Sequence, residues 1–113
     1  MTNLDGKQMN VVKTAGNGVV NQDTIFTFTQ KAEVVSARYE GGQVIRGYLA
    51  GRLIQNQLHF KYAQEHMDGN IAGGESACDV KNLPDGRLQL IENFSWDQGT
   101  GQNVFQEIDP SDC

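Results

Sequence analysis

The chain alternates short runs of apolar and polar residues and shows almost no helical periodicity. No window carries apolar residues at i, i+3, i+4 and i+7 behind a capping residue, whereas an alternation with a period of two recurs throughout. Clusters of turn-forming residues separate these runs. The pattern predicts eight β-strands, over residues 8–15, 23–30, 33–40, 43–54, 57–67, 70–81, 87–97 and 102–109.

The predicted strands are joined by short turns, so each strand should pair antiparallel with the next. The clearest turn sequences are Gly41-Gly42, Gln55-Asn56, Asp68-Gly69 and Leu83-Pro84-Asp85-Gly86. Eight such strands leave two exposed sheet edges unless the sheet closes. We therefore predict an all-β fold, an eight-stranded antiparallel up-and-down meander closed into a small barrel, with an interior that holds side chains or one small ligand. An open sheet or a sandwich is the alternative.

Two strands show clearly which side chains point inward. The inward row of the seventh strand is Leu88, Leu90, Glu92, Phe94 and Trp96. The inward row of the fifth strand is Leu58, Phe60, Tyr62, Gln64 and His66. Glu92 is the anomaly, because an unpaired carboxylate inside a barrel is expensive and needs a partner, water or a proton.

The turn lengths then set the register of the neighbouring strands. If the connecting loops have two residues, the residues that flank each loop lie directly opposite each other. That register carries Arg38 and Glu75 to the same interior as Glu92. A bulge near Gly47 or Gly51, or a three-residue loop containing Gly86, would turn these strands over and remove both residues from the interior.

Three functions fit this arrangement. The first is a polar pocket, walled by aromatic rings, that orients a small and partly apolar ligand. Its candidate residues are Glu92, Trp96, Phe94, Tyr62, Phe60, Arg38, His66 and Glu75. The second is an enzyme in which Glu92, with His66, acts as general acid or base. The third is a structural or interaction protein whose barrel is filled, with an apolar outer patch of Ile91, Val104 and Ile108 that pairs subunits into a homodimer.

Composition narrows the partners. The chain has 113 residues, which fits one domain over residues 1–113, and a net charge of −5 with scattered Lys and Arg, which argues against a nucleic-acid partner. No run approaches the roughly 20 apolar residues that span a bilayer, and the polar start is unlike a signal peptide. We expect a cytoplasmic protein with free thiols at Cys78 and Cys113, the latter exposed and able to cross-link.

No motif calls for a metal or a cofactor. His59 and His66 fall on opposite faces of one predicted strand, and no Cys/His spacing resembles a zinc site. Gly73-Gly74 and Gly99-Thr100-Gly101 are turn or bulge glycines, because no helix follows them to hold a phosphate. We expect neither a bound metal nor a cofactor.

From Asn17 to Ile108 the chain resembles a group of bacterial proteins of about this length that are often labelled n-acetylglutamate synthase. The resemblance is carried by the segments Asp23-Thr24-Ile25-Phe26, Tyr39-Glu40-Gly41-Gly42, Gly47-Tyr48-Leu49-Ala50-Gly51, Asp85-Gly86-Arg87-Leu88 and Glu92-Asn93-Phe94-Ser95-Trp96. In the last of these the group usually has Glu-x-Trp-x-Trp, so Glu92 and Trp96 match. It has His near Gln64, has Cys where Ser76 stands, and offers no counterpart of Glu75.

The resemblance implies a small lipocalin-like or avidin-like barrel, in agreement with the strand count. It strengthens Glu92 and Trp96 as site residues. We do not expect the synthase activity, because acetyl transfer from a nucleotide thioester needs a strand–helix junction to hold the pyrophosphate, and this chain has none.

Overall fold

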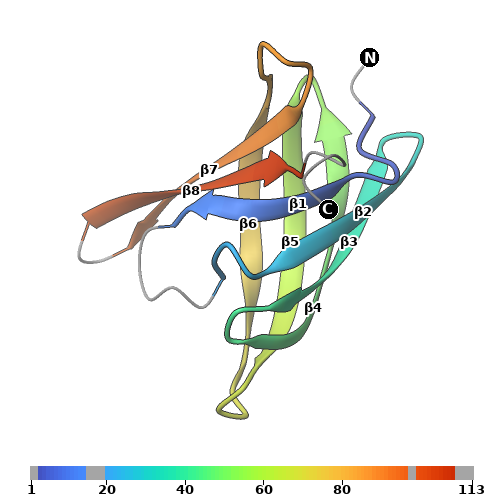
Figure 1. The fold of residues 1–113 in the computed structure, drawn as a ribbon. Helices are drawn as coiled ribbons and strands as arrows, with labels where there is room; N and C mark the ends of the chain where they lie inside the picture. Colours follow the sequence, from blue (N-terminus) through green and yellow to red (C-terminus); the bar gives the residue numbers. More distant parts are fainter. Residues whose placement is uncertain (1–2, 15–19, 97–98, 109–113) are drawn as a thin grey trace.

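Eight antiparallel strands follow one another round a ring in chain order, and the first and last strands pair (Figure 1). This computed structural model describes residues 3–14, 20–96 and 99–108, and of residues 93–96 and 99–100 only the backbone. The strands are β1 (Gln8–Lys13), β2 (Ile25–Lys31), β3 (Val34–Gly41), β4 (Val44–Ile54), β5 (Gln57–His66), β6 (Ile71–Asn82), β7 (Leu88–Trp96) and β8 (Gly99–Glu107). The predicted all-β meander, its strand count and its closure are confirmed.

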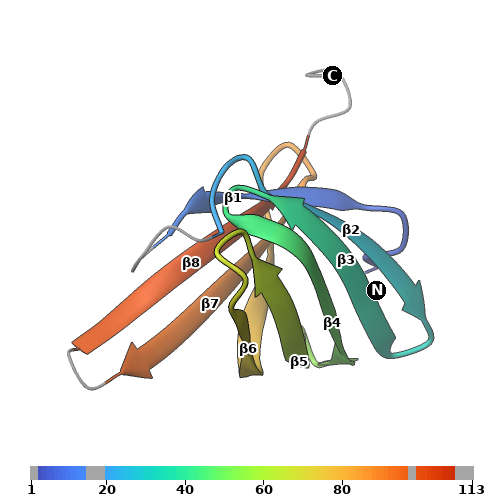
Figure 2. The same cartoon turned by 90° about the horizontal axis from the view of Figure 1, so that it is seen from below.

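Closure comes from the pairing of β1 with β8. Met9 lies opposite Glu107 and Val11 opposite Phe105, and the ladder ends with the Ile108 N–H donating to the Gln8 carbonyl at 2.8 Å. This pairing removes the two free edges that an open meander would expose. In Figure 2 the C-terminal end of β7 and the N-terminal end of β8 extend to one side, beyond the ring formed by the other strands.

The hairpin turns explain the register. Gln55 and Asn56 both have positive φ, 52° and 66°, which is the type I′ geometry, and Leu53 lies opposite Leu58 as predicted. The next two hairpins instead have three-residue loops, each ending in a positive-φ glycine, Gly69 at 89° and Gly86 at 91°. A loop with one extra residue shifts the pairing register of the next strand by one position, so that the side chains expected to point inward point outward.

One end of the barrel is apolar and closed. Its buried side chains, each at most 8% exposed, are Met9, Val11, Phe26, Phe28, Val35, Leu58, Val80, Leu88, Leu90 and Phe105. The segment before β1 covers this end, because Leu4 is fully buried in the same cluster and its N–H donates to Gln30 Oε1 at 2.8 Å. Lys7 and Glu107 add an ion pair of 3.1 Å there. This closed end supplies most of the hydrophobic stabilisation and leaves the other end for chemistry.

Candidate functional site

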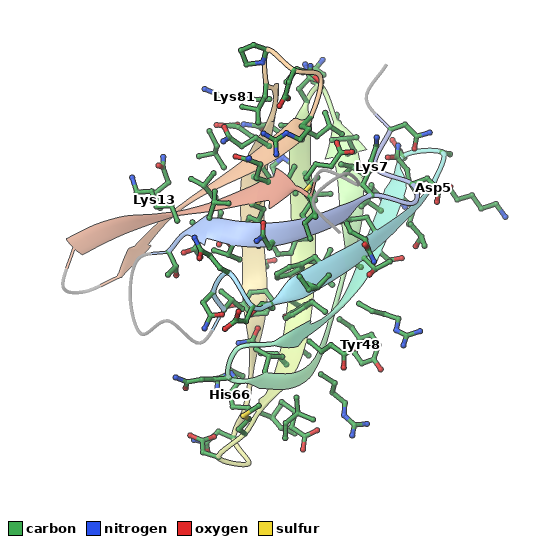
Figure 3. All side chains as sticks on the ribbon, in the orientation of Figure 1. Asp5, Lys7, Lys13, Tyr48, His66 and Lys81 are labelled. Atoms are coloured by element: carbon green, nitrogen blue, oxygen red, sulfur yellow. The ribbon has the colours of Figure 1, made fainter. Side chains whose placement is uncertain are left out.

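The barrel interior changes from apolar to polar along β5. Its inward row begins with Leu58 and Phe60, which are 1% and 7% exposed, and continues with the half-buried Tyr62, Gln64 and His66. Water therefore reaches the interior at the His66 end and not at the Leu58 end. Figure 3 shows His66 at the lower end of the barrel, far from Lys7 at the upper end.

A hydrogen-bonded relay crosses three side chains at this polar end. The Tyr39 hydroxyl donates to Gln64 Oε1 at 2.8 Å, and Gln64 Nε2 lies 2.8 Å from His66 Nε2. A chain of hydrogen bonds therefore joins Tyr39 on β3 to Gln64 and His66 on β5.

Tyr39 is held rigidly. Its ring stacks on Phe26 with centroids 4.3 Å apart and packs flat over Gly47, its register partner on β4. Burial raises the pKa of Tyr39 far above its usual value of 10, and the nearby Tyr62 and Glu92 raise it further. Tyr39 is thus a neutral hydrogen-bond donor at any physiological pH.

Glu92 lies at the border between the apolar and polar ends. It stands opposite Cys78 on β6 and Asn103 on β8, and its Oε1 accepts a hydrogen bond of 2.8 Å from Asn103 Nδ2. Its negative charge raises the pKa of Tyr62 and of the Cys78 thiol, in both cases after the larger effect of burial. Glu92 as a residue is half-buried, and it faces the interior with its partner Cys78.

The strand opposite Tyr62 presents small residues. Ala72, Gly74 and Ser76 of β6 stand opposite Gln64, Tyr62 and Phe60. A Cβ added at Gly74 would come no closer than 3.5 Å to the Tyr62 ring and hydroxyl, which is ordinary contact. Within the described part of the chain, the hydroxyls of Tyr62 and Ser76 make no hydrogen bond to protein. Both are available to a ligand.

Four of the predicted site residues face the interior and two do not. Glu92, Tyr62, Phe60 and His66 all face the interior, as predicted. The inward placement of Arg38 and Glu75 is wrong. Arg38 is exposed opposite Thr27 and Tyr48, where it lines an outer groove, and Glu75 is exposed opposite Lys61.

Bulges and loop lengths cause this correction. The pairing register between β3 and β4 shifts next to Tyr39. The register between β4 and β5 shifts at Ile45, which is an extra residue between the paired residues Val44 and Arg46. The three-residue loop that ends in Gly86 turns β6 over, which is the alternative that the turn sequence had left open. Each shift by one residue exchanges the two faces of a strand.

For two further predicted site residues the structure describes only the backbone. Phe94 and Trp96 occupy β7 opposite Gly101 and Gly99, but their side chains fall outside the described residues. Cys113 falls outside them as well. The roles predicted for Phe94 and Trp96 stay predictions.

The predicted outer patch is not exposed. Ile91 and Val104 stand opposite each other on β7 and β8, and Val104 is only 8% exposed. Ile108 is half-buried. Pairing of subunits through this patch stays a prediction.

Sequence reasoning missed five residues of the site, namely Tyr39, Gln64, Ser76, Cys78 and Asn103. The row Val35, Ala37 and Tyr39 is more apolar than its alternate and indicated the true inward face of β3. The assumed two-residue turn outweighed that signal.

Among the described residues, no three His, Cys, Asp or Glu side chains gather closely enough to hold a metal ion. The same residues include no helix with the length and hydropathy to cross a membrane. The site is therefore built from hydrogen-bonding groups, aromatic rings and one carboxylate.

Comparison with known proteins gives a family. A family model described as avidin-like protein matches residues 2–108, nearly the whole chain. Searches of the curated proteins and of the solved structures give no match. The match does not test the synthase activity with which the resembling bacterial proteins are labelled. It agrees with the closed eight-stranded barrel, and the chain belongs to the avidin-like protein family.

Proposed function

We propose that this protein binds a small, partly apolar molecule in the polar end of its barrel. Glu92 anchors a polar group of the ligand, and Tyr62 and Phe60 form part of the apolar wall. The avidin-like barrel is a fold known for binding small molecules, which supports the class of function and not a particular ligand.

The observation that carries the proposal is the set of polar groups that point inward without a complete set of protein partners. In the described part of the chain, the hydroxyls of Tyr62 and Ser76 have no protein partner, and the Glu92 carboxylate accepts one protein hydrogen bond, from Asn103. Since no buried side-chain nitrogen or oxygen of the described residues lacks a partner, these hydroxyls are open to solvent, and a ligand can replace that solvent. Polar groups that a ligand can reach serve recognition.

The size of the residues on β6 supports the same conclusion. Small side chains at Ala72, Gly74 and Ser76 face the aromatic and polar row of β5. We propose that a flat or chain-like apolar group of the ligand packs against the Tyr62 ring beside these small residues. We extend the wall to Phe94 and Trp96 on the strength of their alternation with Glu92 along β7.

The test is a thermal-shift screen against a library of metabolites, followed by calorimetry on each hit. Wild type is compared with Glu92→Gln and with Glu75→Gln, a matched control in which the same change is made on the outer face. A ligand that stabilises wild type and Glu75→Gln but not Glu92→Gln supports the proposal. Ligands that stabilise all three proteins equally would place binding elsewhere.

Catalysis by Glu92 remains a separate prediction. If a hit is converted to product, the Glu92→Gln variant should bind it but not convert it, because an amide cannot transfer the proton. Retained turnover in that variant would exclude Glu92 as the acid or base.

We also propose a cytoplasmic location. Cys78 is a free, buried thiol, which suits a reducing compartment. Cell fractionation checks the location, and recovery in an extracellular fraction would contradict it.

A further inference from the structure

The cationic side chains of this protein all avoid the polar end of the barrel interior. The chain has nine Lys and Arg residues, and all of them lie among the described residues. Seven are exposed: Lys13, Lys31, Arg38, Arg46, Arg52, Lys61 and Lys81. The other two, Lys7 and Arg87, are half-buried and paired with Glu107 and Asp85. No cationic side chain neutralises Glu92.

The tyrosine and cysteine side chains next to Glu92 are neutral. Burial raises the pKa values of Tyr39, Tyr62 and Cys78, so these groups keep their protons at physiological pH. His66 Nε2 is engaged by a hydrogen bond of 2.8 Å with Gln64 Nε2. Among the described side chains, Glu92 is the carboxylate of the polar end of the interior, and no Lys or Arg side chain lies there.

The walls of this end are suited to a cation. The rings of Phe60 and Tyr62 lie with centroids 6.2 Å apart and planes inclined by 51°, and Tyr62 faces the small residue Gly74. Aromatic faces attract ammonium and guanidinium groups through the ring quadrupole. The hydroxyls of Tyr62 and Ser76 can both accept hydrogen bonds from N–H groups.

We propose that the site selects ligands with a cationic head group that donates N–H bonds, a primary ammonium or a guanidinium, attached to a small apolar body. The head group pairs with the Glu92 carboxylate and the apolar body packs against Tyr62 and Phe60. This inference depends on the proposed function, because it names the chemical class of the ligand bound at that same site. It also excludes a class, since a carboxylate or phosphate there would meet Glu92 with no compensating cation.

The experiment uses three probes that share one phenyl ring and differ in charge: 2-phenylethylamine, 2-phenylethanol and 3-phenylpropanoate. Binding to the full chain is measured at pH 7 by ligand-observed NMR, which detects weak complexes. We expect the amine to bind wild type about ten-fold more tightly than the alcohol, and the carboxylate to bind most weakly. The preference for the amine should weaken as the salt concentration rises.

Variants assign the preference to Glu92. In Glu92→Gln the amine and the alcohol should bind equally, whereas Glu75→Gln should behave as wild type. If Glu92→Gln does not fold, as judged by circular dichroism, the ranking of the three probes by wild type decides.

The outcomes separate the two proposals. If the alcohol or the carboxylate binds as tightly as the amine, the barrel binds small molecules but the cationic class is wrong. A preference for the amine that survives in a folded Glu92→Gln variant also overturns this inference. If neither the three probes nor any member of the metabolite library binds, the proposed function fails and this inference fails with it.

Discussion

Gly47 gives the sharpest test of how the site is held. It lies opposite Tyr39, and a Cβ at Gly47 would overlap the tyrosine ring, with Cδ2 at 2.8 Å and two other ring atoms closer still. The ring cannot retreat, because Phe26 stacks on its other side at 4.3 Å and its hydroxyl is bonded to Gln64. Gly47→Ala should therefore displace the ring and break the relay to His66.

The magnitude follows from three contributions. Overpacking a well-packed core costs about 1–3 kcal/mol. Loss of the bond from Tyr39 to Gln64 costs roughly 0.5–1.5 kcal/mol. Replacing glycine with alanine lowers the entropy of the unfolded chain and returns about 0.4–1 kcal/mol. The net loss in the free energy of unfolding should be about 2 kcal/mol.

The assay is urea unfolding followed by circular dichroism, with Gly74→Ala as the matched control. Alanine at Gly74 meets Tyr62 at 3.5 Å or more, so that variant should match wild type or gain up to about 1 kcal/mol. With an m-value of roughly 2 kcal/mol per molar, the Gly47→Ala midpoint should fall by about 1 M. Equal midpoints for the two variants would refute the rigid packing of Tyr39.

Further predictions concern groups on both faces of the barrel. In a Cys113→Ser background, Cys78 should react with a thiol reagent only on unfolding, because it is 2% exposed and burial raises its pKa; prompt reaction in the native state would contradict this. The absorbance of ionised tyrosine should show Tyr39 and Tyr62 titrating above pH 10, as tested with single Phe variants. Since their folded pKa values exceed the unfolded value of 10, stability should be unaffected below pH 10 and fall as the pH rises above it. Arg38→Ala should change the free energy of unfolding by less than about 0.5 kcal/mol and leave ligand binding intact, and a loss of binding would return Arg38 to the site.

The difference between what could and could not be predicted is clearest at β5 and β3. On β5 the alternation of Leu58, Phe60 and Tyr62 with polar neighbours is strong, and the Gln55-Asn56 turn has the two-residue geometry expected of it. Local pattern and turn agree there, so the inward face was predicted correctly. On β3 they disagreed, and the assumed turn at Gly41 placed Arg38 inside.

The site residues also differ in whether the sequence alone could predict them. Glu92 could be found from its own strand, because it interrupts an apolar row whose direction is certain. The partnership of Tyr39, Gln64 and His66 joins β3 to β5 at a distance in sequence, and no local signal specifies it. Asn103 likewise meets Glu92 only because β8 pairs with β7 in one particular register.

The sequence by itself determined that this protein is a single meander of eight strands, where the hairpins turn and that Glu92 faces inward. These features depend on residues close together in the chain, whose alternation and turn chemistry are local properties. Only the tertiary structure decided which face of β3 and β6 is buried, and hence that Arg38 and Glu75 lie on the outer face while Glu92 faces inward. The reason is that a bulge or one extra loop residue exchanges the inward and outward faces of a whole strand. Whether a bulge forms depends on how well each face packs against the rest of the barrel, which the local sequence does not specify.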